Sequence, residues 1–192
     1  MIKAALQFLA TQLNQYLRRK SHIQEDMVVV SRIMDNDGHE SEHSTNKLVL
    51  FIANIEKDTI AHTSAKPEFD GFRNIMRANP IFLNLHIVLA ANFKANHYEE
   101  SLKYLSKAVG FFQDHSVFDR ANSPELASGL EKLILDIENL NFQEMSNLWS
   151  FLGCKYVPSV MYKVRTVALG SEYSYFRPYV IHVPEDASIG KL

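Results

Sequence analysis

The sequence has few of the residues and motifs that mark the active sites of many enzymes. Its 192 residues include one cysteine, Cys154, and seven glycines that are dispersed along the chain. A single cysteine cannot form an internal disulfide, which suits a reducing compartment. The glycines form no G-x-x-x-x-G-K or G-x-G-x-x-G pattern, so the sequence gives no support for nucleotide binding. Cys154 has no histidine or acid close by in sequence, and a small packed side chain is a better interpretation than a catalytic nucleophile.

Positive charge and long apolar runs are also scarce. The formal net charge of -2 argues against nucleic acid as a partner, because a grip on phosphate backbones needs clustered lysine and arginine. No stretch approaches the roughly 18 consecutive apolar residues that indicate a membrane span. Polar residues such as Gln7 and Thr11 interrupt the apolar start of the chain, and no small-residue cleavage site follows. We therefore expect no membrane span and no signal peptide.

The hydrophobic pattern predicts one α/β domain in which helices cover a single central sheet. The composition fits this, with 46% hydrophobic and 22% charged residues. A polar loop at 35–46 separates the first two strands. The elements expected, in chain order, are a helix at 2–17, strands at 27–33, 48–55 and 81–91, a helix at 98–112, a strand at 133–138, a helix at 142–152 and a strand at 157–167.

Capping signals and strand alternation add detail to these elements. Asn96 and Asn141 each stand three residues before a glutamate, which is the spacing of a capping box at the start of a helix. In the helix at 98–112, we expect one buried stripe. In the strand at 81–91, alternation places His86 on the face opposite the leucines. The residues expected in the helical stripe are Tyr98, Leu102, Leu105, Val109 and Phe112.

A literal H-E-x-x-H pattern occurs at residues 39–43. On a helix, His39 and His43 would bind zinc one turn apart, with Glu40 as a general base. The pattern lies in the polar loop at 35–46, where no apolar residue can seat a helix against a core. A solvated loop with accidental spacing is the better interpretation, and we expect it to be mobile and free of metal. A zinc hydrolase stays as the less favoured alternative.

No other constellation supports catalysis. There is no G-x-S-x-G elbow, and Glu131, Asp136 and Glu138 are expected on the outer face of a strand, where solvation is a better explanation than acid and base chemistry. The remaining histidines show no ligand spacing. We therefore predict a protein that is not an enzyme and that holds no metal and no cofactor.

The last part of the chain, residues 171–192, has a different composition from the domain at 1–170. It gathers aromatic residues and an arginine, the residue types that anchor protein interfaces, around a proline that suits an edge strand or an extended arm. Folding back over the chain's own sheet is an equally good interpretation. Lys163 and Arg165 point away from the tyrosine face of the last strand and join the interface candidates. The candidates in the arm are Tyr173, Tyr175, Phe176, Arg177 and Tyr179.

Several segments together resemble one known family. The sequence is similar to the N-terminal domain of cap proteins from extracellular contractile injection systems of the antifeeding-prophage and virulence-cassette type. The similarity runs from the first helix to about residue 167. The segments that carry it are 79–85 (NPIFLNL), 90–93 (AANF), 98–102 (YEESL), 134–140 (ILDIENL), 148–153 (LWSFLG) and 156–165 (YVPSVMYKVR).

The resemblance implies a structural subunit. Members of this family form a hexameric ring on the last layer of tube and sheath, and they are related in fold to phage tail terminators, in which helices pack on a mixed β-sheet. The implied partners are copies of the chain itself, tube and sheath subunits, and a second cap protein if this chain is one of two caps. The implied location is a particle assembled in the bacterial cytoplasm and then released or anchored to the cell. An assembly adaptor elsewhere in the particle is the alternative role.

Overall fold

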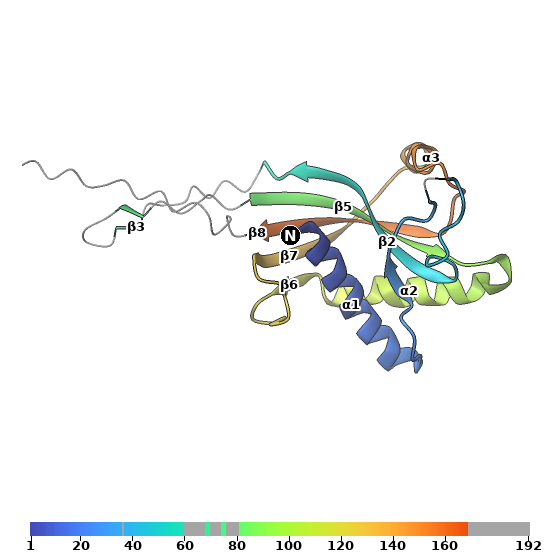
Figure 1. Ribbon diagram of the computed structural model, residues 1–192, viewed down its shortest axis with the longest axis horizontal. Coiled ribbons are helices and arrows are strands. Elements are labelled where there is room, and N and C mark those ends of the chain that lie inside the picture. The colour runs from blue at the N-terminus through green and yellow to red at the C-terminus, as the bar shows by residue number, and fades with distance from the viewer. Residues whose placement is uncertain (36, 60–67, 70–73, 76–80, 169–192) are drawn as a thin grey trace, which may run out of the picture.

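A six-stranded mixed β-sheet forms the centre of the molecule (Figure 1). The computed structural model describes residues 1–35, 37–59, 68–69, 74–75 and 81–168. The strand order is β1-β2-β5-β8-β7-β6, in which β1 runs parallel to β2 and all other neighbours are antiparallel. The strands are β1 (Val28–Val30), β2 (Lys47–Lys57), β5 (Ile81–Asn92), β6 (Val117–Asp119), β7 (Leu130–Glu138) and β8 (Ser159–Ala168).

In the described part of the chain, three α-helices flank this sheet, as the sequence predicts. They are α1 (Ile2–Ser21), α2 (Tyr98–Asp114) and α3 (Phe142–Phe151), and a 3-10 turn, η1 (Ala95–His97), precedes α2. Figure 1 shows α1 and α2 on one side of the sheet and α3 on the other. A separate two-stranded ladder, β3 (Glu68–Phe69) with β4 (Asn74–Ile75), lies between β2 and β5 in sequence.

The main core lies between the sheet and the pair α1 and α2. Leu9, Leu13 and Leu17 recur on one stripe of α1 and are almost fully buried. They belong to the same cluster as apolar side chains from alternate positions of the strands, because successive strand residues face opposite sides of a sheet. The strand residues in this core include Leu48, Leu50, Leu85, Ile87, Leu89, Leu133, Leu135, Tyr162 and Val164.

A second, smaller core lies under α3 on the opposite face. Trp149 is the buried residue of α3, and it packs with Val49 and Phe51 of β2 and with Val88 and Ala90 of β5. A capping box fixes the start of this helix: the Asn141 side chain accepts from the Glu144 backbone at 2.9 Å, and the Glu144 carboxylate accepts from the Asn141 backbone at 2.9 Å. The sequence predicted this cap correctly.

The second predicted capping box is wrong. Asn96 lies inside the 3-10 turn η1, so His97 becomes the residue before α2 and makes no side-chain cap hydrogen bond. The buried stripe of α2 is also rotated from the predicted one. Tyr98 and Leu102 are 53% and 39% exposed. The helix instead packs against α1 and the sheet through Ser101, Tyr104, Leu105, Ala108, Phe111 and Phe112.

The other differences concern short strands. The first strand was predicted over 27–33 but pairs only at Val28–Val30, because the chain then leaves the edge of the sheet. The sequence did not reveal β6, which pairs three residues with β7. In the described part of the chain, no helix is long and apolar enough to cross a membrane.

Candidate functional site

Polar side chains line the face of the sheet that α3 leaves open. The register of β2, β5, β8 and β7 brings them into adjacent rows, with His86 opposite Asn54 on one side and Lys163 on the other. Asp136 lies opposite Lys163 in turn. We call this surface the polar face. Its residues are Asn54, Glu56, Asn84, His86, Asp136, Glu138, Lys163 and Arg165.

His86 lies at the centre of the polar face and is only 7% exposed. Its Nδ1 lies 2.5 Å from Oε2 of Glu138, and its Nε2 lies 3.2 Å from Oε2 of Glu56. Hydrogen bonds to a charged carboxylate are stronger than bonds between neutral groups. The Nδ1 contact reaches past β8 and joins β5 to β7, whereas Nε2 lies near Glu56 of β2 without making a hydrogen bond to it. The sequence predicted the face of His86 but could not show partners that are 52 residues apart in the case of Glu138.

The two basic interface candidates in the described residues, Lys163 and Arg165, do lie on the polar face. Arg165 is 40% exposed and its Nε lies 3.5 Å from Oδ2 of Asp58, a carboxylate that is only 6% exposed. Lys163 is half-buried and makes no ion pair with the described residues. Their role as interface contacts stays a prediction. The other candidates, Tyr173, Tyr175, Phe176, Arg177 and Tyr179, lie outside the described residues.

The H-E-x-x-H loop does not form a helix. Met34 and Glu40 make an antiparallel bridge, and a turn follows from residue 42 to residue 46. His39 and His43 are both exposed. Among the residues that the structure describes, no group of three potential metal ligands comes together.

Buried serines and hydrogen bonds anchor this loop, so it is less solvated than the sequence suggests, and its mobility stays a prediction. Ser44 is fully buried, and its hydroxyl donates to the Ser41 carbonyl at 2.8 Å. The side chain of Asn92 donates to Glu40 at 2.9 Å and to the Ser44 carbonyl at 3.2 Å. The sequence missed this because the anchor, Asn92, lies at the end of a strand 52 residues from Glu40. Glu40, the supposed zinc base, is thus occupied as a structural acceptor.

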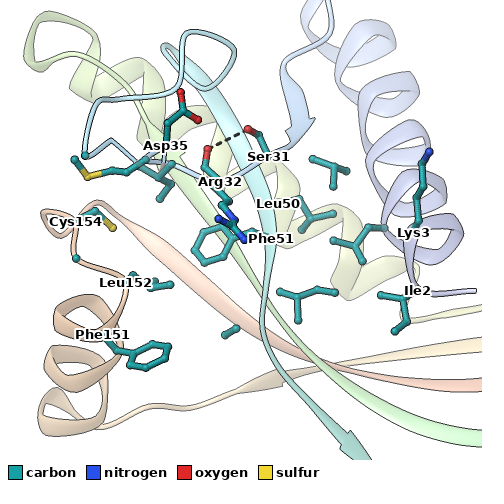
Figure 2. A pocket seen from close by; sticks show the side chains of 18 residues that line it. Ile2, Lys3, Ser31, Arg32, Asp35, Leu50, Phe51, Phe151, Leu152 and Cys154 are labelled. Carbon is teal, nitrogen blue, oxygen red and sulfur yellow. Dashed lines mark hydrogen bonds between the residues drawn. The ribbon is translucent and has the colours of Figure 1, made fainter.

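A groove of about 960 Å³ runs along the outer edge of β2. Figure 2 shows β2 passing between α1 on one side and the end of α3 on the other. We call it the edge groove. Its lining includes Ile2, Lys3 and Leu6 of α1, residues 50–53 of β2, and Phe151, Leu152 and Cys154 at the end of α3.

Exposed apolar side chains gather around the edge groove and α3. Phe151, which lines the groove, is 86% exposed, and Phe142 at the start of α3 is exposed to the same degree. Val30 lines the groove and Ile55 continues the same edge of β2; both are 44% exposed. Large apolar and aromatic side chains left in solvent mark surfaces that bind other proteins. Sequence patterns do not reveal this cluster, because Phe142 and Phe151 fall in an otherwise ordinary amphipathic helix.

Cys154 faces this groove as a packed thiol (Figure 2). Burial raises the pKa of the Cys154 thiol above its ordinary value. The thiolate is the reactive form of cysteine, so the raised pKa opposes nucleophilic chemistry. The surfaces described above therefore offer contacts for another polypeptide rather than a set of reacting groups.

Solved structures of other proteins share this fold. One is a cryo-EM structure of the anti-feeding prophage cap, described as a tube terminating cap, with a TM-score of 0.56 and 12% sequence identity over 90% of this chain. Another is the sheath/tube terminator, in the extended state, of an extracellular contractile injection system, PVC, with a TM-score of 0.54 and 14% identity over 94% of this chain. The chain spans 57% and 65% of the length of these two proteins. The fold is thus that of tube and sheath terminators, and neither structure is described as an enzyme.

The family follows from the sequence itself. The model of the Pvc16 N-terminal domain matches residues 4–182, and the chain belongs to that family. This confirms the resemblance found in the sequence, and the match extends past residue 170 into the segment that we treated as an arm. No curated protein matches the sequence.

Proposed function

We propose that this chain is a structural cap subunit that terminates the inner tube, the sheath or both in a contractile phage-tail-like injection particle, as a hexameric ring. The observation that carries the proposal is the family match over residues 4–182. The shared fold with a tube terminating cap and with a sheath/tube terminator supports it.

The surfaces of the molecule fit a role in assembly. The edge groove and the exposed aromatics of α3 offer apolar area to a partner, while the polar face offers half-buried charges such as Lys163 and Arg165. Apolar residues with a polar surround are the usual make-up of a protein interface. The partners proposed are copies of this chain, tube and sheath subunits, and a second cap protein where the particle uses two.

A deletion in a producing strain tests the proposal. Particles assembled without this chain should lack the ring at one end, and their tube and sheath should vary in length, because nothing stops growth at a fixed layer. Supplying the chain should restore uniform particles. Supplying the His39→Ala, His43→Ala double variant should restore them equally well, since the H-E-x-x-H loop holds no helix and Glu40 is a structural acceptor.

Two outcomes would contradict the proposal. If the deletion leaves particle ends and lengths unchanged, the chain is not the terminator. If the chain is found at the baseplate end instead, it is an assembly adaptor. Failure of the double histidine variant alone, with bound zinc in the original chain, would favour the hydrolase.

A further inference from the structure

The outer edge of β2 is an open position in the sheet. The strand β1 pairs with β2 only at Leu48, Val49 and Leu50. From Phe51 to Lys57, no described strand lies beside this edge, so alternate backbone N–H and C=O groups point outward. Such an edge can accept one further strand through main-chain hydrogen bonds.

The edge groove surrounds this open position on both sides. Leu50 belongs to the core on the α1 face, whereas Phe51 belongs to the core under α3. The walls are Ile2 and Leu6 on the first face and Phe151 on the second, as Figure 2 shows for Ile2 and Phe151. Side chains of a strand alternate between the two faces of a sheet. A strand added here would therefore place alternate side chains against α1 and against α3.

The opposite edge of the sheet is protected in a way that the β2 edge is not. There, β6 covers β7 only at Lys132, Leu133 and Ile134, and the uncovered part of β7 carries Asp136 and Glu138. Charged side chains on an edge strand oppose the addition of another strand. On the β2 edge, the charged residues Glu56 and Lys57 stand only at the end of the open stretch, and residues 51–55 carry no charge.

We propose that the edge groove binds residues 171–192 of a neighbouring copy of this chain as an added strand on β2. This inference rests on the proposed function, because a cap ring brings copies together. The segment has the right chemistry: Tyr173, Tyr175 and Tyr179 stand at alternate positions, and Val180 to Val183 continue a run of residues that favour strands. In an extended strand these tyrosines share one face and Phe176, Pro178 and Val180 share the other, so apolar side chains would face both walls of the groove.

The segment also has the reach to leave its own protomer. Residues 169–192 follow the end of β8, and a fully extended chain spans about 3.3 Å per residue, or up to about 80 Å for this segment. The open edge from Phe51 to Lys57 needs only about 23 Å at the same rise. Enough chain remains to cross to the neighbour.

Topology favours a neighbour's segment over the chain's own. The strand β8 ends where β5 begins, since Ala168 pairs with Ile81, and β2 ends at the same side of the sheet. To reach the outer edge of β2, the chain's own segment would have to cross the connection from β2 to β5. Connections do not cross one another on the same edge of a sheet.

Pro178 specifies which side of the added strand can pair with β2. Proline has no N–H to donate, so it is tolerated in a strand only where its nitrogen faces away from the partner. The N–H groups of Tyr175, Arg177 and Tyr179, which have the other parity, would then point at β2. Each copy gives a segment and accepts one, and such head-to-tail contacts close into a ring when the rotation between copies fits.

Paired cysteines test this inference in the full-length chain. Cys154→Ser removes the native thiol, and two chains are then mixed: one with Ile55→Cys on the open edge and one with Arg177→Cys in the segment. The matched control replaces Ile55→Cys with Ile137→Cys, which lies on the uncovered part of β7 and is 43% exposed, against 44% for Ile55. Moving the segment cysteine to each position from 173 to 181 in turn shows which segment residue lies opposite residue 55, and this gives the register of the added strand.

The inference predicts a disulfide-linked dimer with Ile55→Cys, its loss with Ile137→Cys, and a yield that alternates with segment position. The mixture should be oxidised both as concentrated protein and within capped particles. A chain that carries both cysteines and loses both thiols while staying a monomer, with no dimer in the mixture, would show that the groove binds its own segment and would overturn the inference. Absence of any product would overturn it as well.

The same experiment separates this inference from the proposed function. Particles that are capped normally but yield no Ile55→Cys dimer would remove the groove assignment and leave the cap role standing. A dimer in solution from a chain that is absent from particle ends would leave the groove assignment standing and remove the cap role. As a second variant, Ile55→Lys should abolish self-association and capping, whereas Leu102→Lys, at an exposed site of α2, should change neither.

Discussion

The two faces of the sheet differ in how completely the chain covers them. On one face, α1 alone buries eight residues, and α1 and α2 together close a continuous apolar core. On the other face, α3 buries only Trp149, and the rest of the sheet carries the polar row around His86. The first arrangement explains the stability of the fold. The second leaves the polar face and the exposed aromatics of α3, and the edge groove lies where the two faces meet along β2; an assembly subunit needs such features.

The largest effect should come from a cavity in the covered face. Leu133→Ala, at a fully buried site of β7, should lower the free energy of unfolding by about 2 to 5 kcal/mol in a denaturant titration. Ile137→Ala, on the same face of the same strand but 43% exposed, is the matched control and should cost well under half as much. Equal losses would mean that burial of Leu133 in this core adds nothing to stability beyond what a half-exposed site provides.

The pH dependence of the free energy of unfolding tests the same face, because it reports the burial of the Tyr162 hydroxyl. Burial raises the pKa of Tyr162 to about 12, from an ordinary value of 10.0. Below pH 10 both the folded and the unfolded chain keep this proton. Between pH 10 and 12 only the unfolded chain releases it, so the free energy of unfolding should fall by about 2 to 3 kcal/mol.

The Tyr162→Phe variant isolates this effect from the titration of other groups. Denaturant unfolding at several pH values from 8 to 12 should show a shallower loss of stability for Tyr162→Phe than for the original chain. Parallel curves would contradict the burial of this hydroxyl.

A smaller effect is expected on the open face, where α3 depends on its own cap. Asn141→Ala removes both the acceptor for the Glu144 backbone and the capping box, and should cost about 1 kcal/mol. Asn96→Ala provides the comparison, since Asn96 makes no cap bond for α2 and its loss should be close to neutral. Hydrogen exchange of α3 should quicken only in the first variant. If both variants lost a similar free energy of unfolding, Asn96 would act as a cap after all, as the sequence predicts for α2.

The smallest expected effect concerns the loop at 39–43. Elemental analysis of the purified chain should find no stoichiometric zinc, and the His39→Ala, His43→Ala double variant should keep its melting temperature, because both imidazoles are exposed. Bound zinc that is lost in the double variant would contradict the structural interpretation of the loop.

These comparisons show which features the sequence could predict. Hydrophobic periodicity alone predicts the helices, most of the strands, and the sides of the sheet on which His86 and Tyr162 lie, because each of these depends on the local spacing of apolar residues. The capping box at Asn141 was predictable for the same reason. The anchor of the 39–43 loop and the contact of His86 with Glu138 were not, since each joins residues 52 positions apart. The edge groove depends on where β1 stops pairing, which tertiary packing decides.

The central claim is that this chain terminates a contractile particle, and a cryo-EM reconstruction of the particle end tests it most directly. The account predicts a ring of six copies on the last layer of tube and sheath, with a segment from each copy lying along β2 of its neighbour. A terminal layer with a different symmetry, or one without this chain, would contradict it.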